Sequence, residues 1–498
     1  MDYLDPRKKQ AHKRRLLVGY FLIAIAIGIS TLLVVYLANG YYVNRDTGQV
    51  IQNGLVYVDA EPGGAEIYIN GEKQRGSTDA RLVIPAGLYD IELKKEGYRN
   101  WARSLILEGG SLRKLTYPKL IPNELEAGVE TVLRADPVSA LQSIDKRWLV
   151  LSYANTPLEI SVVDTESEDF AVRPIQIPEN IVPAQLAGSV EFVEWADDDK
   201  SLIAKYTSGT SVNYILVDIE NPTLAINLNT LLGDQTYKIQ FADRKKDNFF
   251  VYQPSTQSLF TASVTNGLNR TPILTKVIDY KTFNSDWILY LTAGTEPGMV
   301  ESRFKRGDKD ILIKKLKTSD KYYLQLAKLG NAPVMGVASA VENRAIVYND
   351  PEKYLNENPG TNIPLATTVL RVNNLSDLRI STDSSIIMAY GPDNFASHEF
   401  DFDRSYNFRV SVPVDSTQEL RWMDGQHFLF NSGSKQVMMD FDGSNMYELV
   451  SSVPKIGSFY TNNLSVMMTV SPAIVSTDVS ITKSSKFVAT NLFIAADR

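Results

Sequence analysis

The sequence contains no cysteine among its 498 residues. Disulfides, thiolate-bound metals, a cysteine nucleophile and a lipid-modified cysteine are therefore all excluded. Histidine is also scarce, with His12, His398 and His427 as the three examples. A histidine-based zinc site would need the last two together with a carboxylate. The chain must rely on apolar cores for its stability, and its length allows two to four domains.

Motifs of the common enzyme classes are absent as well. The sequence has no Gly-x-Ser-x-Gly elbow, no glycine-rich phosphate loop ending in Lys-Ser or Lys-Thr, and no His-Glu-x-x-His. Residues 440–445, DFDGSN, are faintly similar to a calcium loop, but Ser451 stands where an EF-hand needs glutamate. We interpret this stretch and the triplet Asp197–Asp199 as polar turns. The sequence therefore predicts no catalytic, metal-binding or cofactor-binding residue, and no cofactor.

Charge is missing from one long stretch, Leu16–Ala38. As a helix these residues would reach about 35 Å, enough to cross a hydrocarbon core of about 30 Å. We predict a transmembrane anchor that begins at Leu16, passes Ile25 and ends at Ala38. Two alternatives stay open, a buried core helix and a cleaved signal peptide. The apolar core of a signal peptide is normally about 7–15 residues long, which favours the anchor.

A basic cluster precedes the apolar stretch; its members are Arg7, Lys8, Lys9, Lys13, Arg14 and Arg15. Basic residues stay on the cytoplasmic side of a membrane, so residues 1–15 should form a cytoplasmic tail next to anionic lipid. This tail carries net +4 and the whole chain −7, so the remainder carries −11. An acidic remainder argues against nucleic acid as a partner. Residues 39–54 are polar and are expected to be a juxtamembrane spacer outside the membrane.

From residue 55 the sequence alternates apolar and polar residues over short runs separated by turns, which is typical of β-strands. A period of two places one set of side chains on the inward face: Tyr57, Ile67, Ile69, Ile91 and Leu93. Asn70-Gly71 and the stretch from Pro85 to Gly87 are expected to be turns between strands.

Residues 55–120 resemble the PEGA domain, a small β-sandwich module of prokaryotic extracytoplasmic proteins. The stretch EPGGAEIYINGE at 61–72 is similar to the opening of that domain, although Gly63 stands where glutamate is usual. The residues that carry the resemblance are Pro62, Gly63, Gly64, Ala65, Gly71, Gly87, Gly97 and Tyr98. The resemblance implies an extracytoplasmic location and no catalytic residue. We expect Tyr98 and Trp101 to be core or edge residues, and binding of a glycan or partner by them is the alternative.

A repeat of apolar strand, turn and apolar strand recurs about every 40–50 residues in the rest of the chain. Residues 192–204 and 420–430 show it most clearly. This spacing matches one four-stranded propeller blade and resembles propellers of the TolB and WD40-like kind. We predict an all-β chain after the anchor, with a linker at 121–138 and a β-propeller at 139–498. Eight blades are favoured and seven are possible. Residues 487–494 should close the ring by pairing within 132–153.

These features predict a single-pass protein of the cell membrane whose bulk is extracytoplasmic. The favoured function is a non-catalytic binding or scaffolding protein of the cell envelope. It would recognise a protein or glycan through propeller loops and the PEGA-like module. The alternative is a hydrolase or lyase of cell-wall polysaccharide, with carboxylates converging at the propeller channel. The mostly basic run 303–317 is expected to be a solvated hairpin, with binding of an anionic ligand as the alternative.

Overall fold

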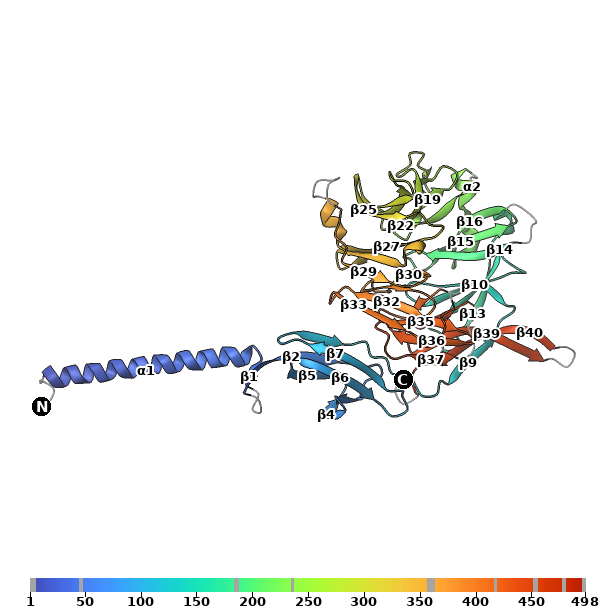
Figure 1. Cartoon of the computed structure of the whole chain (residues 1–498). Coiled ribbons are helices and arrows are strands. Elements are labelled where there is room, and N and C mark those ends of the chain that lie inside the picture. The colour runs from blue at the N-terminus through green and yellow to red at the C-terminus, as the bar shows by residue number, and fades with distance from the viewer. Residues whose placement is uncertain are drawn as a thin grey trace. The chain divides into compact units, whose positions relative to one another are not determined.

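A computed structural model describes residues 6–43, 48–182, 188–233, 237–355, 363–415, 419–450, 456–476 and 481–494. The chain divides into two compact units, residues 1–123 and 124–496. Apart from one long helix, the regular structure consists almost entirely of strands (Figure 1). The all-β class predicted from the sequence is confirmed, with an apolar helix at the N-terminus.

The helix α1 covers Pro6–Ala38, so the basic cluster lies on the same helix as the apolar stretch. Its part from His12 to Ala38 is long and apolar enough to cross a membrane. From residue 16 to residue 38 every side chain is exposed, and Gly19 alone is half-buried. The helix ends where the Asn39 side chain donates to the carbonyl of Val35 (2.7 Å). The expected tail at 1–15 is therefore helical from Pro6 onward.

The rest of the first unit is a sandwich of two four-stranded sheets. One sheet contains β1 (Tyr41–Val43), β2 (Val50–Val58), β5 (Ala80–Pro85) and β8 (Leu112–Leu115), and β8 alone is parallel to its neighbour β2. The other contains, in order, β4 (Glu72–Ser77), β3 (Glu66–Ile69), β6 (Gly87–Lys94) and β7 (Trp101–Leu107).

The core of this sandwich contains four of the five side chains predicted to point inward. Ile67, Ile69, Ile91 and Leu93 are buried. The prediction for Tyr57 was wrong, because that side chain is 38% exposed while its neighbours Val56 and Val58 are buried. Strand β2 alternates faces with a period of two, so an offset of one residue moves every side chain to the opposite face.

The second unit is a propeller. Its described strands form eight four-stranded antiparallel sheets, and the first four follow one another along the chain. They consist of β10 (Pro137–Gln142), β11 (Trp148–Tyr153), β12 (Glu159–Asp164) and β13 (Val172–Gln176); β14 (Ser189–Trp195), β15 (Ser201–Ser208), β16 (Ser211–Asp218) and β17 (Ile226–Asn227); β18 (Lys238–Ala242), β19 (Lys245–Gln253), β20 (Ser258–Ser263) and β21 (Gly267–Leu268); and β22 (Val277–Phe283), β23 (Trp287–Ala293), β24 (Met299–Arg306) and β25 (Lys309–Lys317).

The other four sheets continue the same order, except for the last strand of the eighth. They consist of β26 (Tyr322–Leu329), β27 (Ala332–Ser339), β28 (Arg344–Asn349) and β29 (Thr368–Arg371); β30 (Asp377–Ile380), β31 (Ile386–Tyr390), β32 (Asn394–Glu399) and β33 (Arg404–Arg409); β34 (Arg421–Trp422), β35 (His427–Ser432), β36 (Lys435–Asp440) and β37 (Tyr447–Val450); and β38 (Ser458–Tyr460), β39 (Val466–Ser476), β40 (Ile481–Asn491) and β9 (Ala127–Val132).

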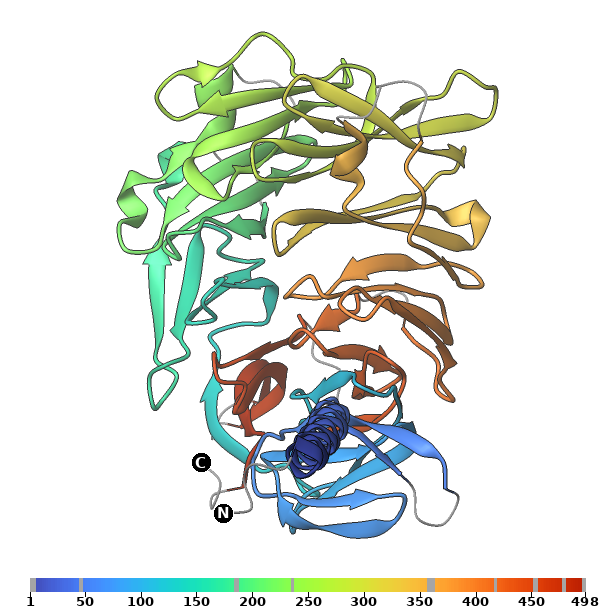
Figure 2. The ribbon, with the colours of Figure 1, turned by 90° about the vertical axis from the view of Figure 1, so that its left-hand side faces the viewer.

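The sheets follow one another around a ring (Figure 2). First strands of neighbouring sheets contact each other, for example β22 with β26 and β26 with β30, so the first strand of each sheet is innermost. The second strand of each sheet is covered on both faces by the neighbouring sheets, and in β31 all five residues are buried. This burial on both faces explains the short, uninterrupted apolar runs of the repeat.

The polar turns of the repeat are held by aspartates between the first and second strands. Asp198 accepts from the N–H groups of Lys200 (3.0 Å) and Ser201 (2.8 Å). Asp383 accepts in the same way from the N–H of Ser385 (3.0 Å). Side-chain carboxylates that bond to the main chain two residues on are a standard means of fixing a turn. The triplet at 197–199 is therefore a structural turn between two propeller strands, as expected.

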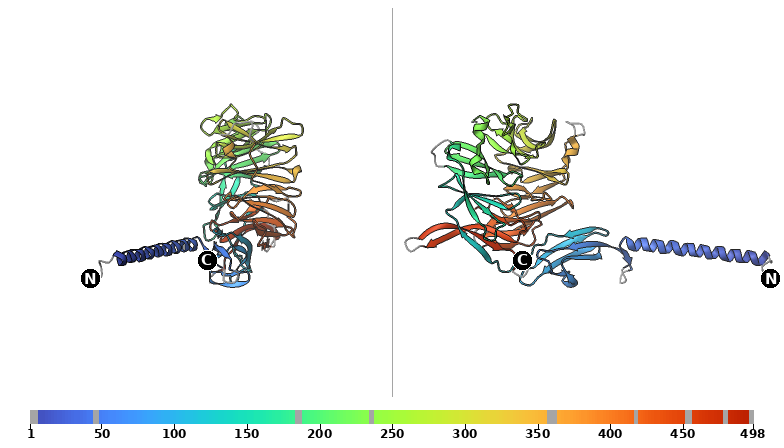
Figure 3. Two further views of the ribbon diagram at one scale, coloured as in Figure 1. Left: turned by 60° about the vertical axis from the view of Figure 1, so that its left-hand side comes forward. Right: turned by 180° about the vertical axis from the view of Figure 1, so that it is seen from behind.

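The ring closes through a strand that comes from the beginning of the unit. Strand β40 pairs with β9, with Phe487 opposite Thr131 and Lys486 opposite Val132. The prediction that residues near 487 close the ring is confirmed. The expected partner at 132–153 overlaps the observed one only at its start, where Val132 pairs with Lys486 and the N–H of Leu133 donates to the carbonyl of Ser485 (2.9 Å). The expected linker at 121–138 is corrected too, since it contains β9 and the start of β10. Figure 3 shows the long β39–β40 hairpin projecting from the ring of sheets.

Candidate functional site

The turns of the PEGA-like sandwich use the residues that carried the resemblance. Gly64, Gly71 and Gly97 have φ between +81° and +85°, a region that side chains rarely adopt. The N–H of buried Ala65 donates to Thr78 Oγ1 (2.9 Å), and Pro62 is buried beside it. Gly63 offers its carbonyl to Lys95 Nζ (2.6 Å). These residues shape the backbone of the sandwich.

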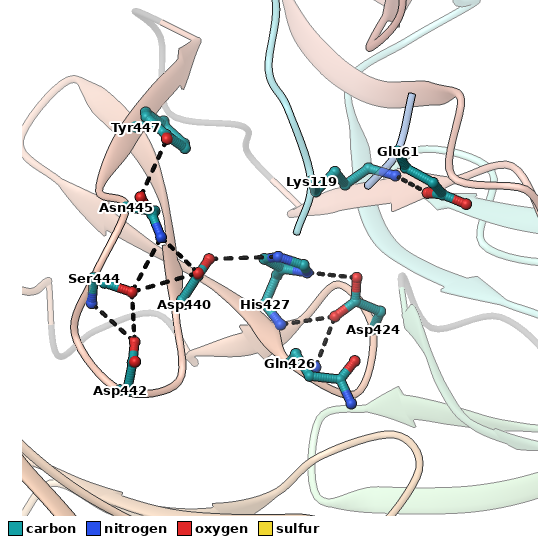
Figure 4. A network of polar contacts seen from close by, with 10 residues as sticks. All are labelled: Glu61, Lys119, Asp424, Gln426, His427, Asp440, Asp442, Ser444, Asn445 and Tyr447. Atoms are coloured by element: carbon teal, nitrogen blue, oxygen red, sulfur yellow. Dashed lines mark hydrogen bonds and ion pairs between the residues drawn. The ribbon is translucent and has the colours of Figure 1, made fainter. Parts of the chain in front are cut away.

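Two aromatic residues of this sandwich are in its core. Tyr98 and Trp101 are both buried, as the favoured interpretation expected. Gly87, at the start of β6, lies against the ring of Tyr89. Lys119 is also buried, with 2% of its side chain exposed, and its Nζ lies 2.8 Å from Glu61 Oε2 (Figure 4).

His427 is the centre of a buried polar network in the seventh sheet (Figure 4). Its Nδ1 lies 2.7 Å from Asp424 Oδ2, and its Nε2 lies 3.4 Å from Asp440 Oδ1. The ring is 1% exposed. Burial acts to raise the pKa of Asp424, but the attraction of His427 and three hydrogen bonds bring that pKa down to about 2. The network joins the turn before β35 to the end of β36.

Residues 440–445 belong to the same network. Asp440 Oδ2 accepts from Asn445 Nδ2 (2.8 Å), and Ser444 Oγ donates to Asp442 Oδ1 (2.6 Å). The other late histidine, His398, is buried separately and pairs through Nδ1 with Ser405 Oγ (3.0 Å). Among the described residues no group of three or more His, Asp or Glu side chains could hold a metal ion.

Polar side chains of the innermost strands link neighbouring sheets around the ring. The links are Ser139 Oγ with the N–H of Phe192 (3.2 Å), Glu194 with the N–H of Phe241, Gln240 Nε2 with Thr282 Oγ1 (2.7 Å), Gln325 Nε2 with the carbonyl of Leu378 (2.7 Å), Arg379 with Glu419 (2.9 Å), and Gln142 Nε2 with the carbonyl of Tyr460 (2.7 Å). Where a linked group is buried between two sheets, the bond gives it a partner that it would otherwise lack.

The carboxylates of these innermost strands also bond to groups within the propeller. Burial raises the pKa of Glu194 to about 7, although its hydrogen bond from Phe241 and the charge of Arg244 act in the opposite direction. Burial also raises the pKa of Asp279, against the N–H of Tyr280 and the attraction of Lys281. Asp377 pairs with Arg379 at 2.7 Å. These carboxylates have separate partners, whereas polysaccharide hydrolysis needs two that converge on one substrate.

The basic run at 303–317 lies in the hairpin of β24 and β25, and carboxylates pair with several of its charges. Arg303 lies 3.2 Å from Glu301 and 2.9 Å from Asp310. Lys315 pairs with Glu296 (2.6 Å), and Arg306 pairs with Glu352. The hairpin expected from the sequence is therefore present, and these ion pairs weaken its capacity for an anionic ligand.

A cavity of about 420 Å³ lies between β29 and the outer strands β32 and β33 of the next sheet. Its lining consists of Arg371, Asn373, Asn394, Phe395, Asn407, Phe408 and Arg409. In the described part of the chain, neither guanidinium forms a hydrogen bond or an ion pair. Sequence reasoning missed this group, and the alternation of Ser405, Asn407 and Arg409 along one exposed strand face was the available signal.

Comparison with known proteins agrees with the architecture of the first unit. Residues 53–118 match the PEGA domain. This match covers the turns at Pro62, Gly71 and Gly97 described above. A search of curated proteins finds no similar sequence.

Several solved propeller structures are similar to the chain at low identity. The Dos1 propeller is 11% identical, with 74% of this chain and 95% of that chain covered and a TM-score of 0.45. Hsv2p of Kluyveromyces lactis is 12% identical, with 72% and 99% covered and a TM-score of 0.37. The β-propeller domain of Cps50 (Swd1) from Myceliophteria thermophila is 8% identical, with 74% and 100% covered and a TM-score of 0.38. The propeller architecture of this chain rests on its strand pairing.

Proposed function

We propose that this chain is a membrane-anchored, extracytoplasmic binding or scaffolding protein of the cell envelope. It recognises a protein or a glycan through the propeller and the PEGA domain. The observation that carries the proposal is the exposed apolar surface of α1 between residues 16 and 38. Apolar surface of this extent is costly in water, and a helix satisfies its own backbone hydrogen bonds in lipid.

The orientation follows from charge. The cluster from Arg7 to Arg15 precedes the apolar stretch, and Tyr36 stacks on Tyr41 at its other end (centroids 4.6 Å apart). Basic residues are retained in the cytoplasm and tyrosines favour the membrane interface. Both β units follow the helix and therefore belong on the outer side. The role is binding, since the buried polar groups described above serve the frame and the PEGA domain supplies turns and core.

The absence of cysteine gives a direct test of topology. His12→Cys places a thiol before the apolar stretch, and Thr210→Cys places one in the exposed turn between β15 and β16. A membrane-impermeant maleimide added to intact cells should label the variant at 210, and the variant at 12 only after lysis. The reverse pattern would overturn the orientation. Loss of an N-terminal tag from the mature protein would show a cleaved signal peptide in place of an anchor.

Insertion of the helix can be tested at its centre. Ile25→Arg should move the protein out of the membrane fraction, because a central arginine costs about 2.5–3.5 kcal/mol during insertion. Ile25→Leu is the matched control and should fractionate as the original chain does. Equal membrane fractions for all three proteins, after a carbonate wash, would contradict the proposed anchor.

A further inference from the structure

Two arginines that have no partner among the described residues line one cavity, whereas carboxylates pair with several other arginines of the propeller. The chain as a whole is acidic, with 58 Asp and Glu against 51 Lys and Arg. Arg303, Arg344 and Arg379 each lie within 3.2 Å of a carboxylate. Arg371 and Arg409 make no such pair within the described residues. A guanidinium that faces a cavity without a carboxylate is available to an outside anion.

Hydrogen bonds and ring stacking between propeller strands hold the wall of the cavity in place. Asn394 Nδ2 donates to the carbonyl of Asn373 (3.2 Å), and Asn394 Oδ1 accepts from the N–H of Asn373 (2.9 Å). This reciprocal pair fixes the segment after β29 against β32. Phe395 and Phe408 stack beneath it with centroids 5.2 Å apart and planes 5° apart. A site built on rigid strands loses little entropy when it binds a ligand.

The polar groups of the cavity are those that recognise an oxyanion on a hydroxyl-bearing ring. Arg409 and Asn407 alternate on the outermost strand β33, and both are exposed. Guanidinium forks bind carboxylate and phosphate through two parallel hydrogen bonds. The amide of Asn407 has no partner among the described residues and can both donate to and accept from hydroxyl groups. A volume of about 420 Å³ is within the range of small-ligand sites.

We propose that this cavity binds an acidic sugar, with Arg371 and Arg409 on its carboxylate or phosphate and Asn407 on its hydroxyls. This inference rests on the proposed function, because it specifies the glycan that the propeller would bind. A second hollow, in the PEGA domain, offers less to an anion. Its Lys94 pairs with Glu92 at 2.8 Å, and its Lys95 donates to a main-chain carbonyl.

The test uses the full chain in detergent micelles and isothermal titration with four probes. The probes are D-glucuronate, glucose 6-phosphate, inorganic phosphate and glucose. Glucuronate or glucose 6-phosphate should bind, and the one that binds identifies the anion. Arg371→Ala and Arg409→Ala should each weaken that binding roughly tenfold to a hundredfold, the range for hydrogen bonds to charged groups. Arg270→Ala, an exposed position elsewhere on the propeller, is the matched control and should bind normally.

Each possible result of the titration either supports or overturns the proposed binding of an acidic sugar. No binding by either acidic sugar at 10 mM, about the weak limit of the method, would overturn the proposal, as would normal binding in both alanine variants. Inorganic phosphate binding as tightly as glucose 6-phosphate would overturn the sugar part. Melting temperatures matching the original chain exclude unfolding as the cause of any loss. The titration in micelles does not depend on topology, so its failure is distinct from failure of the cysteine-labelling test.

Discussion

Phe487 is the side chain at which the closure of the ring can be tested with one substitution. It lies on β40, opposite Thr131 of β9, and its side chain is 0% exposed. It belongs to a core cluster with Leu149 and Leu151 of the first sheet and with Met468 of the last. Phe487 therefore packs against both ends of the ring.

The size of the effect follows from that burial. Replacing a buried phenylalanine with alanine costs about 3–5 kcal/mol, because transfer free energy is lost and a cavity is left. Domains are stable by about 5–15 kcal/mol, so Phe487→Ala should remove a large fraction of the stability of the propeller. A change of 1 kcal/mol shifts the melting temperature by about 2–4 °C in domains of 150–250 residues, and by less in a larger one. We expect a fall of roughly 5–10 °C.

The assay is thermal unfolding of the full chain by circular dichroism and calorimetry. Two transitions are expected, since the chain has two compact units. Phe487→Ala should lower only the transition of the propeller. The matched control is Val132→Ala on the partner strand, since Val132 is 61% exposed and pairs opposite Lys486. Surface substitutions of this kind change stability by less than about 0.5 kcal/mol.

One result would refute the reasoning. If Phe487→Ala and Val132→Ala unfold at the same temperature, the β9–β40 pairing does not hold the ring closed. A chain ending at residue 484 gives a stronger version of the test. It removes the buried part of β40 and exposes the edges of β9 and β39, so it should aggregate. A monomeric truncated chain with an unchanged melting temperature would contradict closure in the same way.

The buried acidic groups predict opposite responses to pH. The folded-state pKa of Glu194 is raised to about 7, so ionisation of this carboxyl opposes folding. In urea titrations the original chain should therefore lose up to about 3 kcal/mol of stability between pH 4.5 and 7 relative to Glu194→Gln. Substitution of the exposed Glu191 with Gln is the control and should show no such trend. The folded-state pKa of Asp424 is lowered to about 2, so its stabilising effect is present above about pH 4 and is lost as pH falls toward 2. His427→Asn should lower the free energy of unfolding at pH 7 by about 1–3 kcal/mol, because buried carboxylates lose their partner, and equal stability at pH 7 would contradict this.

Local signals were sufficient for the parts of the fold that depend on neighbouring residues. The turns at Gly71 and Gly97 require positive φ, which glycine adopts without strain, so the PEGA resemblance could be detected from sequence. The propeller repeat could be detected because its turns and apolar runs recur at a regular spacing. Tyr57 shows the limit of this reasoning, since period two gives the alternation but not which of two adjacent residues faces inward.

Features that join distant segments could not be predicted in the same way. Strand β9 has the sequence AGVETV and alternates exposed and half-buried residues, so it looked like a linker. Its identity as a strand depends on β40, more than 350 residues away. The basic residues show the same dependence. Arg303 is neutralised and Arg371 is not, and the difference arises from which carboxylates the strand register places beside each of them.

The position of the proposed site follows from what the frame requires of polar side chains. The innermost strands need theirs to connect neighbouring sheets, as Gln240 and Gln325 do. The turns need theirs to fix the backbone, as Asp198 and Asp424 do. The outermost strands have one unpaired edge, and within the described residues Asn407 and Arg409 of β33 have neither task. A binding site can form there without breaking the ring, and the cavity beside β33 is at such a place.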